Sequence, residues 1–241
     1  MSKTFTIGII VPWADDRVPA DGPTMYPDVK WVPKGVGVEA LTPEGYDPAM
    51  RRILPAAEEL AGKGVDAVCV MGTSLTFYKG AVVHRKLMED MARVTGLPVG
   101  TMSQAVIDGL REVGAKEIAV ATAYNDVVNG RLSGFLTEEG FKVRSIKGFG
   151  ISEFGGPAGR KSEQEIIALG REAVAEARAG GKAEGLLVSC GGLRTLGVLE
   201  PLEASDGLPV VSSTPHAFRH AVRLAGHDGR YAGHGRLLGM A

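Results

Sequence analysis

Short runs of apolar residues alternate along the chain with longer stretches in which apolar residues recur at helical spacing. The runs are rich in Val, Ile, Leu and Ala, which is typical of strands covered on both faces in a parallel sheet. The pattern predicts strands at 7–11, 67–71, 98–101, 118–122, 185–189 and 209–212, and helices at 48–63, 79–95, 104–113, 125–139, 162–179 and 216–224. This alternation predicts an α/β fold with right-handed crossovers.

The second half of the chain repeats the first. The run 66–72 matches 184–190, the segment 96–103 matches 207–214, and the run 7–13 matches 118–124. Each pair combines a strand-length apolar run with small residues at its end, where a strand enters a loop or a helix. We therefore predict an internal duplication into two pseudo-symmetric lobes. Residues 1–114 plus 215–241 would form the first lobe and residues 115–214 the second.

Two irregular segments interrupt this pattern. Residues 12–48 are rich in Pro and Gly, but they also carry Trp13, Tyr26 and Trp31, and disordered segments are poor in such aromatic residues. We expect an ordered loop there, with a short strand near 35–41 that covers the site. Residues 149–160 contain Phe154-Gly155-Gly156-Pro157, and we interpret this segment as a mobile flap because its glycines permit hinge-like changes.

Composition narrows the possible partners. The 241 residues are 44% hydrophobic and 23% charged, with a net charge of −1, which gives no support for binding to nucleic acid or to a membrane surface. The N-terminus lacks the features of a signal peptide, and no apolar run approaches the ~20 residues of a membrane-spanning helix. These features predict a soluble cytoplasmic protein. A disulfide between Cys69 and Cys190 is not expected, because they occupy non-equivalent places in the repeat.

Candidate chemistry gathers where the predicted strands end. Ligands of open α/β sheets bind beyond the carboxyl ends of the strands, which would bring Pro12, the segment 72–74, Tyr124 and the segment 189–192 together if the two halves face each other. Hydroxyl groups of Thr73, Ser74 and Tyr124 and the backbone N–H near Gly191 are donors suited to an anion. No Lys or Arg occurs at these strand ends, which favours a transient oxyanion over a permanently bound phosphate.

Cys190 is the asymmetric position of the repeat, because its counterpart in the first half is Gly72. No His or carboxylate flanks it, so we interpret its thiol as a general acid and not as an activated nucleophile. Burial in an apolar site would raise its pKa and a nearby helix N-terminus would lower it, and the sequence leaves that balance open. Cys69, inside an apolar run, is expected only to pack. Tyr124 could equally be a buried rim aromatic, and Thr73 and Ser74 could also cap a helix.

None of the histidines is expected to act in catalysis or to bind a metal. His216 stands at a helix start, where we expect a partly exposed residue in preference to a catalytic acid or base. His84 is expected on the surface. His220, His227 and His234 lack the grouping with acids or cysteines that a metal site needs, so no metal site is predicted.

Several motifs together resemble the arylmalonate decarboxylase family, within the aspartate/glutamate racemase superfamily. The resemblance covers nearly the whole chain and is most specific at residues 18–22, 42–47, 71–75, 77–78, 121–124, 189–193, 209–213 and 221–226. It implies two facing Rossmann-like lobes, an active site in the cleft between them, and no cofactor or metal. Racemases and maleate isomerases of the superfamily carry a cysteine in each half, so Gly72 indicates the single-thiol decarboxylase branch.

The resemblance also implies roles for residues of this sequence. One carboxylate of a disubstituted malonate would lie in an apolar pocket, for which the candidates by position are Pro12, Val38, Gly72, Leu75, Phe154 and Pro157. The other would be held by Thr73, Ser74, Tyr124 and the Gly191 N–H, with Cys190 as proton donor. The implied reaction is cofactor-independent decarboxylation of an α-aryl or alkenyl malonate, a small dicarboxylate, through an enediolate to an enantioenriched acid. The flap around Phe154 departs from the apolar flap expected of the family. The alternatives are a racemase, a maleate cis–trans isomerase and a non-catalytic protein that binds small diacids.

Overall fold

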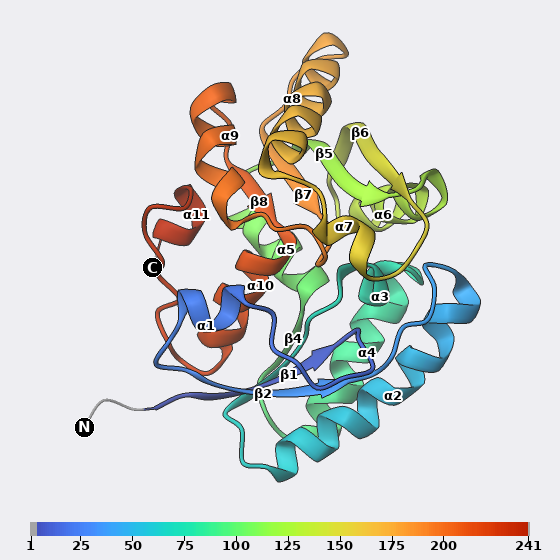
Figure 1. The fold of residues 1–241 in the computed structure, drawn as a ribbon, viewed down its shortest axis with the longest axis vertical. Coiled ribbons are helices and arrows are strands. Elements are labelled where there is room, and N and C mark those ends of the chain that lie inside the picture. The colour runs from blue at the N-terminus through green and yellow to red at the C-terminus, as the bar shows by residue number, and fades with distance from the viewer. Residues whose placement is uncertain (1–3, 241) are drawn as a thin grey trace.

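A computed structural model describes residues 4–240 and shows two four-stranded parallel sheets, one in each half of the chain (Figure 1). The first sheet has the order β2-β1-β3-β4 and the second has the order β6-β5-β7-β8, so the halves share one topology. The strands are β1 (Thr6–Val11), β2 (Lys30–Gly35), β3 (Ala67–Val70), β4 (Val99–Thr101), β5 (Glu117–Tyr124), β6 (Lys142–Ile151), β7 (Gly185–Ser189) and β8 (Val210–Ser212). The predicted two-lobed α/β fold is confirmed.

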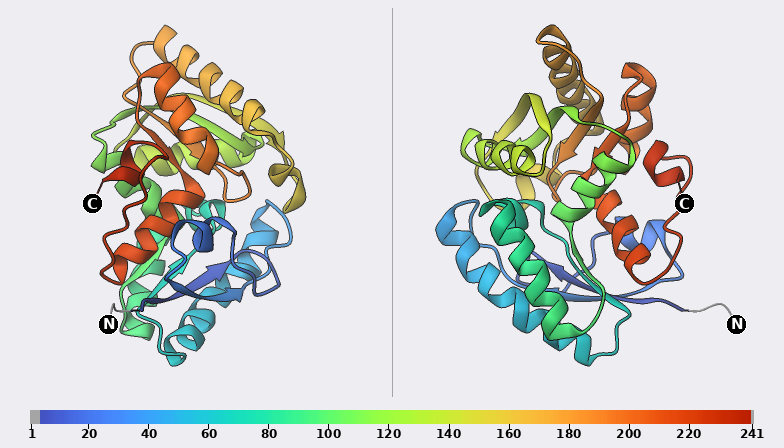
Figure 2. Two further views of the ribbon diagram at one scale, coloured as in Figure 1. Left: turned by 60° about the vertical axis from the view of Figure 1, so that its left-hand side comes forward. Right: turned by 180° about the vertical axis from the view of Figure 1, so that it is seen from behind.

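Helices cover both faces of each sheet (Figures 1 and 2). Alternate residues of β3 show this directly, because Val68 and Val70 join one core cluster while Ala67 and Cys69 join the other. The helices are α1 (Asp21–Met25), α2 (Pro43–Gly62), α3 (Thr73–Phe77), α4 (Gly80–Thr95), α5 (Met102–Glu112), α6 (Asp126–Glu138), α7 (Gly156–Gly159), α8 (Glu163–Ala179), α9 (Leu199–Asp206), α10 (Ser213–Leu224) and α11 (Arg236–Gly239), with a 3₁₀ turn at Leu196–Val198. Cys69 is fully buried, as its packing role predicts.

Two helices cross from one lobe to the other. Helix α5 follows β4 of the first sheet but packs against β7 and β8 of the second, and α10 follows β8 but packs against β3 and β4. The two helices also pack against each other, and Arg219 of α10 donates two hydrogen bonds to Glu112 of α5, at 2.9 and 2.6 Å. The division into residues 1–114 plus 215–241 and residues 115–214 stays a prediction. The packing of α10 on the first sheet agrees with it, whereas α5, assigned to the first lobe, also packs on the second sheet.

The two outer strands β2 and β6 differ most from the sequence prediction. The short strand expected near 35–41 was wrong: the strand is Lys30–Gly35, and β6 was not predicted at all. Both lie at a sheet edge and mix polar with apolar residues, in place of a continuous apolar run. Pro33, which cannot donate to a ladder, is tolerated in β2 because this strand lies at an edge.

The predicted helices are found with shifted ends. Helix α2 begins at Pro43 and not at 48, because the Thr42 side chain caps it and proline is favourable in a first turn. Helix α8 begins at Glu163, after a capping box in which the Ser162 and Glu165 side chains each accept the other residue's backbone N–H.

No helix within residues 4–240 combines the length and the apolar composition needed to cross a bilayer. The expected cytoplasmic location and the absence of a nucleic-acid partner stay predictions.

Candidate active site

A cleft opens between the carboxyl ends of the two sheets, with about 700 Å³ of open space including the solvent at its mouth. Eleven residues were proposed from the sequence as site residues. The cleft is lined by all of them except Pro157, whose neighbour Ala158 lines it instead: Pro12, Val38, Gly72, Thr73, Ser74, Leu75, Tyr124, Phe154, Cys190 and Gly191. Their roles in binding or catalysis stay proposals; the structure places the side chains.

The first lobe contributes the turn from β3 into α3. Gly72 stands just before that helix with φ −150° and ψ 103°, and Thr73 is its first residue. The Thr73 side chain is buried and donates hydrogen bonds to the Ser213 Oγ and the Met102 Sδ, both at 2.9 Å. Ser74 and Leu75 follow it into the cleft. This turn therefore presents two hydroxyl groups from one short helix.

The second lobe contributes Cys190, the first residue after β7. Within residues 4–240 it is the one residue other than glycine with a positive φ, at 156°, a conformation that residues with side chains rarely adopt. The Gly192 N–H donates to its Sγ at 3.4 Å. Removal from water raises the pKa of the Cys190 thiol, and the N–H groups of Gly192 and Leu193 and the Tyr124 side chain offset part of that rise. The thiol is therefore protonated at neutral pH, as a proton donor must be.

Two tyrosines point their hydroxyl groups into the buried part of the site. Within the described residues, the hydroxyl oxygens of Tyr46 and Tyr124 are buried and have no hydrogen-bond partner. Burial raises the pKa of both well above its ordinary value, and the ionisable Cys190 beside them adds to the rise. Both therefore stay protonated and can donate to an anion in the cleft. Tyr46 was missed from the sequence because it belongs to α2, far from any strand end.

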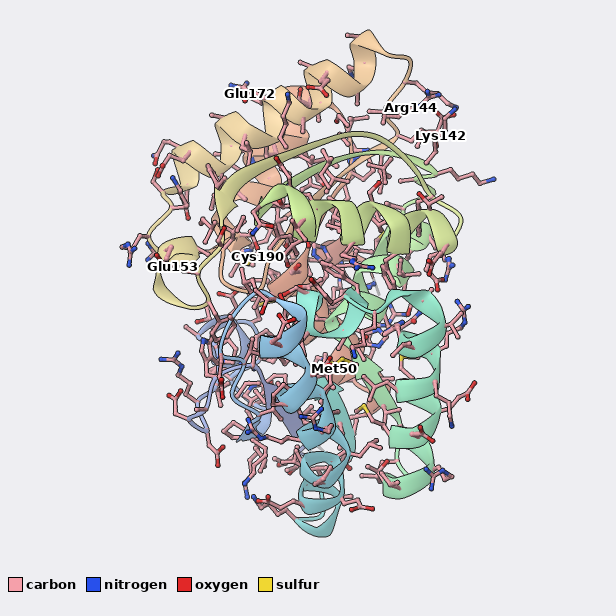
Figure 3. All side chains as sticks on the ribbon, turned by 90° about the vertical axis from the view of Figure 1, so that its right-hand side faces the viewer. Met50, Lys142, Arg144, Glu153, Glu172 and Cys190 are labelled. Carbon is pink, nitrogen blue, oxygen red and sulfur yellow. The ribbon has the colours of Figure 1, made fainter. Side chains whose placement is uncertain are left out.

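The rest of the lining is apolar and nearly uncharged. Within residues 4–240 no Lys or Arg lines the cleft, and Glu153, on the segment that leads into α7, is its one charged residue. Figure 3 shows Cys190 at the level where the lobes meet and Glu153 near the same level. Apolar lining residues that the sequence did not single out are Trp13, Pro19, Leu41, Met71, Met102, Ala123, Ile151 and Ala158. The lining therefore offers a ligand neutral hydrogen-bond donors and apolar surface.

Two expectations about histidines were wrong. His216 is buried, not partly exposed, and its Nδ1 accepts the Ser212 N–H at 2.9 Å. His84 is also buried, because α4 turns it inward to the Thr101 hydroxyl, 2.7 Å from its Nε2. Neither lines the cleft. No group of three or more His, Cys, Asp or Glu side chains among residues 4–240 could hold a metal ion.

Comparison with known proteins shows the same fold in related enzymes. An arylmalonate decarboxylase from Bordetella bronchiseptica is 43% identical over 238 residues, 98% of each chain. A liganded double mutant of arylmalonate decarboxylase has a TM-score of 0.93 at 42% identity, covering 97% of this chain and 98% of that one. A maleate isomerase from Pseudomonas putida S16, solved with maleate, has a TM-score of 0.90 at 20% identity over 99% of both chains, which shows a shared fold.

The duplicated lobes, with the cleft between them, define a two-lobed α/β enzyme fold that arylmalonate decarboxylase and maleate isomerase structures share. Residues 7–238 match the family model described as arylmalonate decarboxylase. The chain belongs to the arylmalonate decarboxylase family, a family of carboxy-lyases.

Proposed function

We propose that this protein decarboxylates α-aryl or α-alkenyl malonates without a cofactor and releases one enantiomer of the monocarboxylic acid. The observation that carries the proposal is a protonated thiol in an apolar cleft that is also lined by hydroxyl donors and, among residues 4–240, by no Lys or Arg. Membership of the arylmalonate decarboxylase family supports the same reaction.

The donors would hold the carboxylate that remains. Thr73, Ser74, Tyr124 and Gly191 line the cleft, and Tyr46, which also lines it, adds a further buried hydroxyl. The second carboxylate would face the apolar lining, where an ionised group is poorly solvated and its loss as neutral carbon dioxide is favoured. The donors then meet the growing negative charge of the enediolate.

Cys190 would complete the reaction. The electron pair of the broken C–C bond passes into the enediolate, and the α-carbon then takes the Cys190 proton to form the new C–H bond. The thiolate left behind regains a proton from solvent. Because one thiol reaches one face of the carbon, one enantiomer dominates.

Substitution of the thiol tests the proposal. Cys190→Ser should lower the rate of carbon dioxide release from phenylmalonate by about 10²- to 10⁴-fold, the usual contribution of a general acid. Cys69→Ala is the matched control, because Cys69 is buried in β3 away from the cleft lining, and it should retain turnover. A Cys190→Ser enzyme as fast as the wild type would refute the assignment of the proton donor.

The alternatives lack a supporting observation in the cleft. A racemase or isomerase that uses two thiols needs a second acid opposite Cys190, and Gly72 at that place has no side chain. A non-catalytic diacid-binding protein would bind phenylmalonate in a calorimeter without releasing carbon dioxide.

A further inference from the structure

Ser213 joins the two catalytic sides of the cleft. It is the first residue of α10 and is fully buried. Its Oγ accepts the Cys190 N–H at 3.2 Å and the Thr73 hydroxyl at 2.9 Å. One buried oxygen therefore touches the proposed proton donor, from the second sheet, and a proposed oxyanion donor, from the first.

The bond to Cys190 supports an unusual backbone. A residue with a side chain at φ 156° is strained and persists only where its surroundings hold it. The Leu193 N–H donates to the Cys190 carbonyl at 3.1 Å and the Gly192 N–H to its sulfur, but both lie within the same turn. Ser213 is 23 residues away and therefore ties this turn to a rigid helix.

The bond to Thr73 fixes the direction of its hydroxyl. The Thr73 hydroxyl has one proton and two acceptors within reach, the Ser213 oxygen and the Met102 sulfur, and a thioether sulfur is the weaker of the two. A substrate carboxylate is a charged and stronger acceptor, so the Thr73 proton turns toward it. The Ser213 hydroxyl, whose own proton is free to rotate, can then donate to the Thr73 oxygen and keep the side chain in place.

In the internal repeat, Ser213 and Cys190 both occur in the second half, and the matching positions of the first half hold neither a serine nor a cysteine. Alignment of 96–103 with 207–214 places Met102 opposite Ser213, and alignment of the strand ends places Thr73 opposite Gly191. A Cβ built on Gly191 would lie 3.4 Å from the Met102 sulfur, so the Gly191–Met102 approach corresponds in the repeat to the Thr73–Ser213 contact. The first residue of α10, in the half of the repeat that carries Cys190, has a hydroxyl group, whereas the first residue of the matching helix α5 is Met102.

We propose that Ser213 is a positioning residue that holds the Cys190 thiol at a fixed distance and orientation from the Thr73 donor. The proposal rests on the proposed function and adds to it a determinant of stereochemical fidelity. Without the Ser213 hydroxyl, the Cys190 turn keeps only the Thr214 hydroxyl bond to the Gly191 carbonyl, at 3.2 Å, as a tie to α10. Cys190 itself is then no longer held, and its sulfur no longer faces one side of the enediolate only.

The test compares Ser213→Ala with Ser212→Ala. Ser212 is the preceding residue and equally buried, but its hydroxyl contacts Thr195 and His216, not Thr73 or Cys190. With phenylmalonate bearing an α-methyl group, Ser213→Ala should lower kcat about tenfold, which is about 1.4 kcal/mol, with a smaller change in KM. The product should also contain a clearly larger share of the minor enantiomer. Ser212→Ala should change neither kcat nor enantiomeric excess.

Enantiomeric excess does not depend on how much of the enzyme is folded, so it separates positioning from simple loss of stability. Iodoacetamide alkylation, followed by peptide mass, adds a readout that needs no turnover: Cys190 should react several-fold faster in Ser213→Ala than in Ser212→Ala. If Ser213→Ala does not fold, Ser213→Gly removes the same hydroxyl.

Unchanged enantiomeric excess with unchanged alkylation would overturn the proposal for Ser213. A wild type that releases no carbon dioxide would refute the proposed function, and the alkylation rates would still decide whether Ser213 positions the thiol.

Discussion

At the scale of single residues, Glu153 sets the charge at the cleft. It is the one charged lining residue within the described chain, and a malonate enters as a dianion but leaves as a monoanion. Its carboxylate therefore opposes substrate binding more than product release. Glu153→Gln should lower KM for phenylmalonate about two- to five-fold at low ionic strength, with little change in kcat and a smaller effect at high salt.

The control for Glu153→Gln is Glu172→Gln, an exposed carboxylate on α8 away from the cleft lining (Figure 3). Steady-state kinetics at several salt concentrations would measure both variants. An unchanged KM at low salt would show that Glu153 does not act on the substrate.

Site residues that directly follow a strand could be predicted from the sequence, whereas site residues on other elements could not. Cys190 and Thr73 follow apolar runs directly, so their place in a parallel sheet predicts the cleft. Tyr46 belongs to α2 and not to a strand end. Ser213 follows a strand directly, but its contacts with Thr73 and Cys190 were not predicted because these two residues come from different lobes. The burial of His84 depends on Thr101 of a different element, which helical spacing alone does not show.

At the scale of elements, the central strands and the short apolar edge strands β4 and β8 were predictable, whereas the edge strands β2 and β6 were not. Continuous apolar runs mark β1, β3, β5 and β7, which each pair on both sides, whereas β2 and β6 carry polar residues on an open face. The crossing of α5 and α10 was also hidden, because a helix that packs on the opposite lobe has the same apolar periodicity as one that packs on its own.

That crossing predicts a stability effect at the Glu112–Arg219 pair. The Arg219 side chain is 6% exposed, so Glu112→Gln leaves a buried charge without its carboxylate and should lower the free energy of unfolding by about 3 kcal/mol. Adding Arg219→Met to that variant should recover part of the loss. The exposed pair Lys63–Glu59 is the control, and Glu59→Gln should cost less than about 1 kcal/mol. Urea unfolding measures all of them, and equal losses for Glu112→Gln and Glu59→Gln would contradict the importance of burial.

At the scale of the whole molecule, two buried histidines make the fold sensitive to acid. Burial lowers the pKa of His84 to about 4 and that of His216 to about 3, because the charged form loses its solvation. In the unfolded chain both return to an ordinary value near 6.5, so between that pH and about 4 the unfolded state binds more protons than the folded state. The free energy of unfolding therefore falls as pH falls through this window, by up to about 1.4 kcal/mol per pH unit for each histidine.

His84→Gln keeps a partner for the Thr101 hydroxyl but cannot take up a proton. Urea unfolding at pH 7, 6, 5 and 4.5 gives the free energy of unfolding, and each protein is compared with its own value at pH 7. The dependence of this free energy on pH should be weaker in the variant, by the amount that one proton contributes. His216→Gln should reduce the slope by a similar amount, because the two sites lie on α4 and α10 and titrate independently. A wild-type stability that stays flat from pH 6.5 to 4.5 would show that neither histidine remains neutral in the folded protein, and that the chain accommodates two buried charges between its lobes and sheets.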